Sequence, residues 1–304
     1  MVRVPARVFL ALSFAAAPAW APAAEVALLK SGDAPAWQPA LDALRRTVGG
    51  HALSEFDLRG ERSEAERVLA SLKGRNAILV ALGSVAAQAV RDFAPESPVV
   101  FCMISDPGKL SLLDQPSVSG VAFVIPAKNQ LAAFRLVYPR ATRIGVIFGE
   151  SARPLVQDAQ KAAGILHQTI VTREVTSEKS VPEALRSLLS GVDAVDALWI
   201  PPDPILLSDQ TRRFLLWEMI KSGKPVFSSS PVLLTEGALA SNGPDYVSIG
   251  EQVGELVNRL AAGDRPARGT FLVPRGELVI NRRIAEKLRI SIPSEALKAA
   301  SRVY

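Results

Sequence analysis

Short, continuously apolar runs alternate with longer amphipathic stretches along most of the chain. Such runs are too continuous for strands with one face in water and are typical of parallel strands buried on both faces. The amphipathic stretches between them predict helices. The alternation therefore predicts βαβ units with right-handed crossovers. The apolar runs lie at 26–29, 77–82, 99–104, 144–148, 197–200 and 225–227, and the predicted helices lie at 38–48, 63–72, 85–93, 130–137, 155–166, 182–189, 208–220 and 249–260.

The order of these units predicts two lobes. A first series of strands and helices ends near residues 118–124, and a second series begins with the helix that follows Pro126. A chain of 304 residues, 48% of them apolar, is long enough to build both lobes. We therefore expect an α/β fold of two doubly wound parallel-sheet lobes. A ligand cleft is expected between them, because ligands bind beyond the carboxyl ends of the strands in such sheets.

The N-terminal segment has the features of an export signal. Residues 1–7 carry two arginines and no acidic residue, residues 8–17 form an apolar run, and small residues stand at positions 21 and 23. This pattern predicts a signal peptide over residues 1–23. Cleavage after Ala23 is favoured over cleavage after Ala21, which would leave a proline first. A membrane anchor is disfavoured because the apolar run is too short to span a bilayer.

Charge and cysteine content indicate in which compartment the protein resides and which classes of partner it binds. The chain has 35 Lys and Arg against 30 Asp and Glu, and loss of Arg3 and Arg7 with the signal would leave 33 against 30. Because the basic residues are scattered, no nucleic acid partner is expected. The single cysteine, Cys102, lies inside an apolar run rather than at the predicted new N-terminus, where a lipid anchor would need it. We expect a buried Cys102 and a protein that is free in the periplasm, not membrane-spanning.

Motifs of catalysis or cofactor binding are missing from the sequence. There is no glycine-rich nucleotide loop and no nucleophile elbow, and His51 and His167 have no second ligand at metal-binding spacing. Paired carboxylates on separate loops would leave no motif in one sequence. The expectation is a protein with no catalytic residue, no cofactor and no metal.

Polar residues follow the predicted strands at the turns 31–33, 83–84, 105–107, 201–204 and 228–230. Ser84 is expected to cap a helix that begins at Val85, where backbone N–H groups and the helix dipole favour a ligand carboxylate. An ordinary N-cap explains this serine equally well. Asp106, Asp203 and Asp245 are candidates to pair with a ligand ammonium, although aspartate beside proline is also a common turn opener.

Several of these segments, taken in order, resemble the ABC transporter substrate-binding proteins of the tryptophan/tyrosine-type uptake group. The resemblance covers essentially the whole chain after the predicted signal. The segments that carry it are 83–89 (GSVAAQA), 98–101 (PVVF), 105–107 (SDP), 118–121 (VSGV), 130–131 (QL), 197–203 (ALWIPPD), 224–230 (KPVFSSS), 236–239 (EGAL), 243–246 (GPDY), 249–250 (IG), 278–281 (LVIN) and 290–293 (ISIP).

The resemblance implies a type I periplasmic binding protein-like fold, with lobes joined by three crossing segments near 121–126, 240–246 and 270–273. Lobe 1 would comprise residues 24–122 plus 243–268, and lobe 2 would comprise residues 123–242 plus 269–304. It also implies capture of a small molecule, an amino acid or a related small carboxylate, and its delivery to an ABC permease with its ATPase. By the resemblance, the cleft would be lined by Ser31, Ser84, Ser105, Asp106, Asp203 and Ser229, with Asp245 at a hinge.

Two departures from the family pattern bear on the ligand. Many relatives have Thr-Pro after the glycine where this chain has Ser84-Val85, and a polar residue where it has Pro204. Aromatic ligands also call for rings to stack against, for which Trp37, Phe148 and Trp199 are candidates. Two other functions stay open: a ligand-binding sensor for a membrane signalling partner, and an enzyme on the same scaffold.

Overall fold

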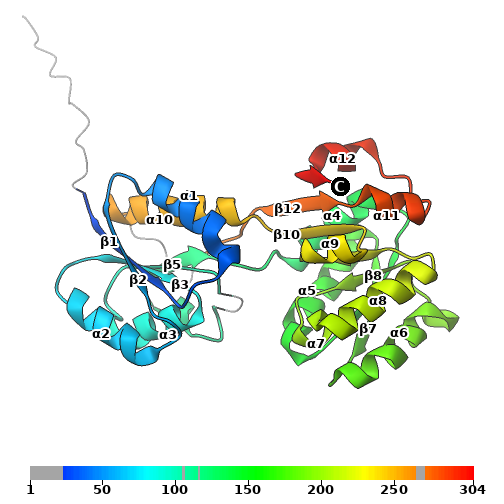
Figure 1. Cartoon of the computed structure of the whole chain (residues 1–304), viewed down its shortest axis with the longest axis horizontal. Coiled ribbons are helices and arrows are strands. Elements are labelled where there is room, and N and C mark those ends of the chain that lie inside the picture. Colours follow the sequence, from blue (N-terminus) through cyan, green and yellow to red (C-terminus); the bar gives the residue numbers. More distant parts are fainter. Residues whose placement is uncertain (1–22, 105–106, 116, 265–270) are drawn as a thin grey trace, which may run out of the picture.

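The computed structural model describes residues 23–104, 107–115, 117–264 and 271–304. It has two lobes side by side, each built around its own sheet (Figure 1). The first sheet is wholly parallel, with the order β11-β5-β4-β3-β1-β2. Its strands are β1 (Glu25–Lys30), β2 (Ala52–Asp57), β3 (Ile78–Leu82), β4 (Val99–Cys102), β5 (Val118–Val121) and β11 (Phe271–Leu272).

Helices cover both faces of this sheet. The helical elements of the first lobe are η1 (Pro35–Trp37), α1 (Gln38–Thr47), α2 (Arg62–Leu72), α3 (Ser84–Phe93), η2 (Leu112–Asp114) and α10 (Tyr246–Ala261). Along β1, Val26 and Leu28 pack with residues of α1 and α10, whereas Ala27 and Leu29 pack with residues of α2 and α3. Helix α10 comes late in the chain yet lies beside α1 (Figure 1).

The second sheet has the order β13-β12-β10-β9-β8-β6-β7 and is parallel except where β12 runs antiparallel to β10. Its strands are β6 (Arg143–Phe148), β7 (Thr169–Glu174), β8 (Ala197–Ile200), β9 (Val226–Ser228), β10 (Ala240–Pro244), β12 (Gly276–Ile280) and β13 (Arg302–Val303). Its helical elements are α4 (Ala127–Val137), η3 (Glu150–Ala152), α5 (Arg153–Ala163), η4 (Gly164–Leu166), η5 (Glu178–Ser180), α6 (Val181–Leu189), η6 (Gly191–Asp193), α7 (Pro204–Leu207), α8 (Asp209–Lys221), α9 (Val232–Glu236), α11 (Arg282–Lys287) and α12 (Ser294–Ala299).

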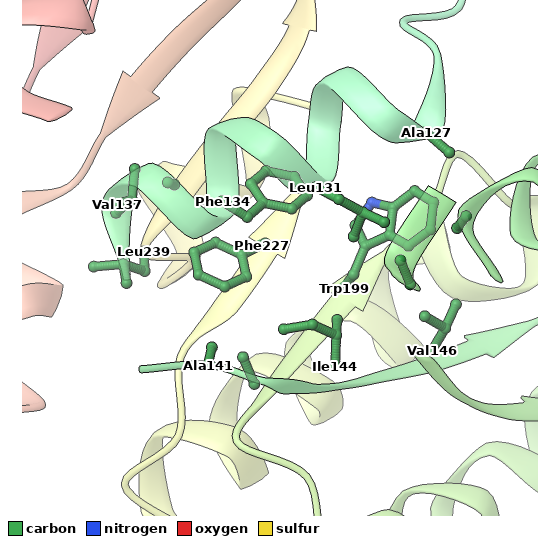
Figure 2. Close-up of a cluster of buried hydrophobic side chains, with 14 of the residues drawn as sticks. Ala127, Leu131, Phe134, Val137, Ala141, Ile144, Val146, Trp199, Phe227 and Leu239 are labelled. Carbon is green, nitrogen blue, oxygen red and sulfur yellow. The ribbon is translucent and has the colours of Figure 1, made fainter. Parts of the chain in front are cut away.

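One of the two buried clusters of the second lobe lies between α4 and the sheet (Figure 2), and the other lies on the opposite face, against α6 and α8. Phe134 and Phe227 stack with ring centroids 4.7 Å apart and planes 8° apart. Trp199 is completely buried, and its Nε1 donates to Oε1 of Gln130 at 3.2 Å. This bond satisfies the one polar atom of the indole, so Trp199 serves the core and is not a stacking surface for a ligand.

Three segments cross between the lobes: from β5 to α4, from β10 to α10, and from β11 to β12. The predicted architecture of two lobes and three crossings is therefore confirmed. Two strands place the lobe boundaries a few residues from those expected. Residues 271–272 pair with β5 in the first sheet, and residues 243–244 pair with β12 in the second. Strand pairing continues into the segments that cross between the lobes. The sequence pattern alone does not show where this pairing ends, so it does not fix the lobe boundary to the residue.

The burial of the cysteine agrees with the prediction from the sequence, whereas several strands do not appear in that prediction. Cys102 is buried in β4 as predicted, and burial raises the pKa of its thiol to about 12. Strands β2, β7, β12 and β13 were not predicted, and β10 and β11 were expected only as crossing segments. Within the ranges that the structure describes, no helix has the length and apolar character needed to cross a membrane.

Candidate functional site

The turns at the carboxyl ends of β1 and β3 meet in the first lobe. The hydroxyl of Ser31, just after β1, accepts a hydrogen bond from the N–H of Ala86 in α3 at 3.0 Å. Between them lies Gly83, whose φ of +88° is a conformation that side chains rarely adopt. A Cβ on Gly83 would lie 2.7 Å from the Ser31 Oγ, so only glycine allows this approach.

This geometry corrects the expected role of Ser84. Helix α3 begins at Ser84 rather than at Val85, and no side chain of its own turn caps it. The cap comes from Ser31 on the neighbouring strand. Ser84 is exposed in the first turn. In the part of the chain that the structure describes, no acceptor is found for the N–H groups of Ser84 and Val85, so both are available to an anion.

Two predicted site residues, Ser105 and Asp106, lie outside the described residues. Their turn follows β4, the strand next to β3 in the sheet. They stay predictions.

Asp203 holds two turns of the second lobe together. The residue is completely buried at the end of β8. Its Oδ2 accepts from the N–H of Gly149 at 3.0 Å and from the Ser151 hydroxyl at 2.9 Å. Its Oδ1 accepts from the N–H of Ile205 at 3.0 Å and so caps α7. Both carboxylate oxygens therefore have partners within the chain, and neither faces water in this structure.

The remaining predicted residues lie near the crossings. Ser229 is half-buried after β9, and its carbonyl oxygen lies 2.4 Å from where a Cβ on Gly243 would stand. Asp245 caps α10 by accepting from the N–H of Ser248 at 3.2 Å, and its own N–H donates to the carbonyl of Arg275 at 2.9 Å. Asp245 thus links two of the three crossing segments.

An aromatic contact links the third crossing to α10. The rings of Phe123 and Tyr246 meet edge to face with centroids 5.8 Å apart. Partial burial raises the pKa of the Tyr246 hydroxyl. Phe123 lies in the segment between β5 and α4, so the pair joins two crossings. Neither residue was predicted as functional, and nothing in the sequence pairs them.

The contacts of Asp203 were also missed from sequence. Gly149 and Ser151 follow β6 just as the predicted turns follow other strands, so the same strand-end rule would have found them. A Cβ on Gly149 would lie 3.1 Å from the Asp203 Oδ2, which leaves little room for a side chain there. Of the candidate stacking rings, Phe148 is 7% exposed and Trp199 is fully buried, while Trp37 is partly exposed.

Comparison with known proteins identifies the family. The model of the ABC transporter substrate-binding protein family matches residues 54–304. The chain belongs to that family. Its fold is the type I periplasmic binding protein-like fold expected above. A curated relative, the tyrosine-binding protein of Clostridioides difficile strain R20291, is 25% identical over 195 residues, which is 61% of this chain. The match spans 55% of that relative's length, about half.

Solved structures share the fold over nearly the whole chain. The ABC domain in complex with L-Trp from Streptococcus pneumonia is 23% identical, with a TM-score of 0.64 over 93% of this chain and 100% of that one. The ligand-free, open structure of a substrate-binding protein with adhesive properties from Clostridium difficile is 17% identical, with a TM-score of 0.78 over 92% of this chain and 99% of that one. At these identities the likeness establishes the fold.

Proposed function

We propose that the protein is the solute-binding component of an ABC uptake system. It would act in the periplasm after loss of residues 1–23, capture a small ligand between its lobes, and deliver it to a permease with its ATPase. The observation that carries this proposal is the family match, joined to a two-lobed fold whose polar turns lie at strand ends. The names of the relatives support an amino acid or a related carboxylate as ligand.

The start of α3 is the proposed site for the ligand carboxylate. The N–H groups of Ser84 and Val85, which have no acceptor among the described residues, point along the helix axis, and the Ser84 hydroxyl would add a third donor. The bond from Ala86 to Ser31 fixes the turn before any ligand arrives. A preformed set of donors binds an anion with little reorganisation.

The other predicted residues take different parts in the proposal. Ser229 would contact the ligand from the second lobe, and Asp245, with Ser105 and Asp106, would lie near its ammonium. Asp203 would act by holding the second-lobe turn in place, because its oxygens already accept three hydrogen bonds. Closure of the lobes is then favoured by the ligand's higher affinity for the closed state.

Calorimetry on the chain from residue 24 to 304 tests the proposal, after bound ligand is removed by unfolding and refolding. The panel contains L-amino acids, their decarboxylated amines and small organic acids. A selective heat signal for one amino acid, absent for its amine, is the expected result. Ser84→Ala should weaken binding by about tenfold, as loss of one charge-assisted hydrogen bond does.

The control variant is Ser294→Ala, which also removes an exposed serine from the first turn of a helix without a side-chain cap. It lies on α12 in the second lobe and should bind like wild type. Absence of binding across the panel would contradict the solute-binding proposal. Equal affinities for the acid and its amine would contradict the carboxylate site at α3.

A further inference from the structure

Trp37 is the one candidate stacking ring that the fold leaves partly exposed. It ends η1, in the connection between β1 and α1. One part of the side chain packs against the buried cluster that β1, α1 and α10 share. The residue is therefore anchored by the core while keeping accessible ring surface at the carboxyl edge of the first sheet.

One end of the indole lies against the turn that starts α3. The Cη2 atom of Trp37 is 3.1 Å from where a Cβ on Gly83 would stand, on the same side as the Ser31 hydroxyl. Because Gly83 has no side chain, the ring reaches the turn without displacing the cap from Ser31 to Ala86. Trp37 thus lies at the turn next to the N–H group of Ser84, for which the described residues offer no acceptor.

The charged residues of the same connection are paired with each other. Lys30, the last residue of β1, and Asp33, the one charged residue between β1 and Trp37, form an ion pair with Nζ and Oδ1 3.1 Å apart. The lysine side chain is only 15% exposed. Lys30 therefore already has a charged partner within this part of the chain.

From this placement we infer that Trp37 is the specificity-determining residue of the first lobe: its indole forms the apolar wall against which the ligand's side chain packs while the carboxylate lies at α3. This inference rests on the proposed function. Binding pockets combine apolar and aromatic walls with a few fixed polar groups, and an aromatic wall adds affinity for flat or bulky apolar groups. Affinity should therefore rise with the apolar surface of the ligand side chain.

Tryptophan fluorescence and calorimetry test the inference together. After loss of the predicted signal, which holds Trp20, the chain contains Trp37, Trp199 and Trp217. Trp199 is buried and Trp217 is 61% exposed on α8. The probes are L-phenylalanine, L-tyrosine and L-leucine, of which L-phenylalanine and L-leucine do not interfere with tryptophan emission. The variants are Trp37→Phe, Trp37→Ala and, as the matched control, Trp217→Phe.

We expect L-phenylalanine to change the emission of wild type and of Trp217→Phe but not of Trp37→Phe. Trp37→Ala should weaken the two aromatic probes by about tenfold and L-leucine by less, and Trp37→Phe should stay within about threefold of wild type. A merely structural role would weaken all probes equally, which would overturn the inference. An emission change that persists in Trp37→Phe would overturn it as well.

The outcomes also separate the inference from the proposed function. Wild type that binds a probe while Trp37→Ala binds it equally well refutes the role of Trp37 alone. Wild type that binds no amino acid at all contradicts both. If Trp37→Ala fails to fold, judged by circular dichroism, the emission of Trp37→Phe decides, because phenylalanine keeps the anchor in the core.

Discussion

Replacing Asp203 by alanine should destabilise the second lobe, although the sequence presents this residue as a ligand contact. The carboxylate is completely buried and accepts bonds from two backbone N–H groups and one hydroxyl. Those bonds fix the turn after β6 to the turn after β8. Alanine removes the acceptors and leaves the donors in place. The loss of stability therefore comes from the donors that water cannot reach.

The size of the effect follows from each donor's surroundings. The N–H of Ile205 loses its helix cap, which costs about 1 kcal/mol. The N–H of Gly149 is buried, and leaving it without an acceptor costs about 1 to 3 kcal/mol. Ser151 is exposed, so its hydroxyl turns to water at little cost. These costs sum to about 2 to 4 kcal/mol, and removal also relieves the burial of a carboxylate, so the net loss for Asp203→Ala should lie at the low end, about 2 kcal/mol.

Urea unfolding followed by tryptophan emission measures this loss, because Trp199 lies in the core of the same lobe. Ser151→Ala, which removes one exposed donor, is the control and should cost below about 1 kcal/mol. Asp203→Asn keeps one acceptor oxygen and should fall between the two. An Asp203→Ala protein within about 1 kcal/mol of wild type would refute the reasoning. So would an Asp203→Asn protein of unchanged stability with reduced ligand affinity, the behaviour of a direct ligand contact.

Three further predictions concern other parts of the fold. Gly83→Ala should lower the free energy of unfolding by about 1 to 3 kcal/mol, because φ is +88° and the added Cβ would clash with neighbouring side chains. Chemical denaturation measures this loss, and an unchanged unfolding midpoint would contradict the prediction. Phe227→Ala should lower the free energy of unfolding by about 3 to 5 kcal/mol, because removal of a fully buried ring that stacks on Phe134 leaves a cavity. A measured loss below about 1 kcal/mol would contradict this, since it would mean that neighbouring side chains fill the cavity. Hydrogen bonds from Arg45, at 2.6 and 2.8 Å, lower the pKa of Glu55. The stabilisation is therefore present above the unfolded pKa of about 4.3 and is lost as pH falls through the lower folded value. Glu55→Gln should cost about 0.5 kcal/mol at pH 7 for this partly exposed pair, and the difference should shrink in acid; a constant difference down to pH 3 would argue against the pairing.

The buried strands could be predicted because both of their faces are apolar. In β1, Val26 and Leu28 face one helical layer and Ala27 and Leu29 face the other, so every position is hydrophobic. The edge strands β2 and β7 carry no such run. They are half-exposed, with the sequences ALSEFD and TIVTRE. A strand at a sheet edge is partly exposed to water and therefore contains polar residues. A search for continuous apolar runs does not detect such a strand.

The sequence predicts the site as a set of turns and not as a set of contacts, and the site stays a prediction. Strand ends converge in a doubly wound sheet, and in the structure Ser31 lies next to the start of α3. What the sequence does not contain is the partner of each polar atom. Ser31 caps a helix 55 residues away, and Asp203 bonds Gly149 at a separation of 54 residues. Such pairs depend on how two crossover units pack, which local spacing does not encode.

These assignments divide the polar groups of each lobe into two kinds. Ser31 and Asp203 have their oxygens occupied by the protein itself. Within the described residues, no hydrogen bond is found for the hydroxyl of exposed Ser84 or of half-buried Ser229. Closing the lobes without a ligand would bury such hydroxyls unpaired, at about 1 to 3 kcal/mol each. A ligand that supplied their partners would remove this cost, so the hydroxyls proposed to bind the ligand would also favour the open state of the empty protein.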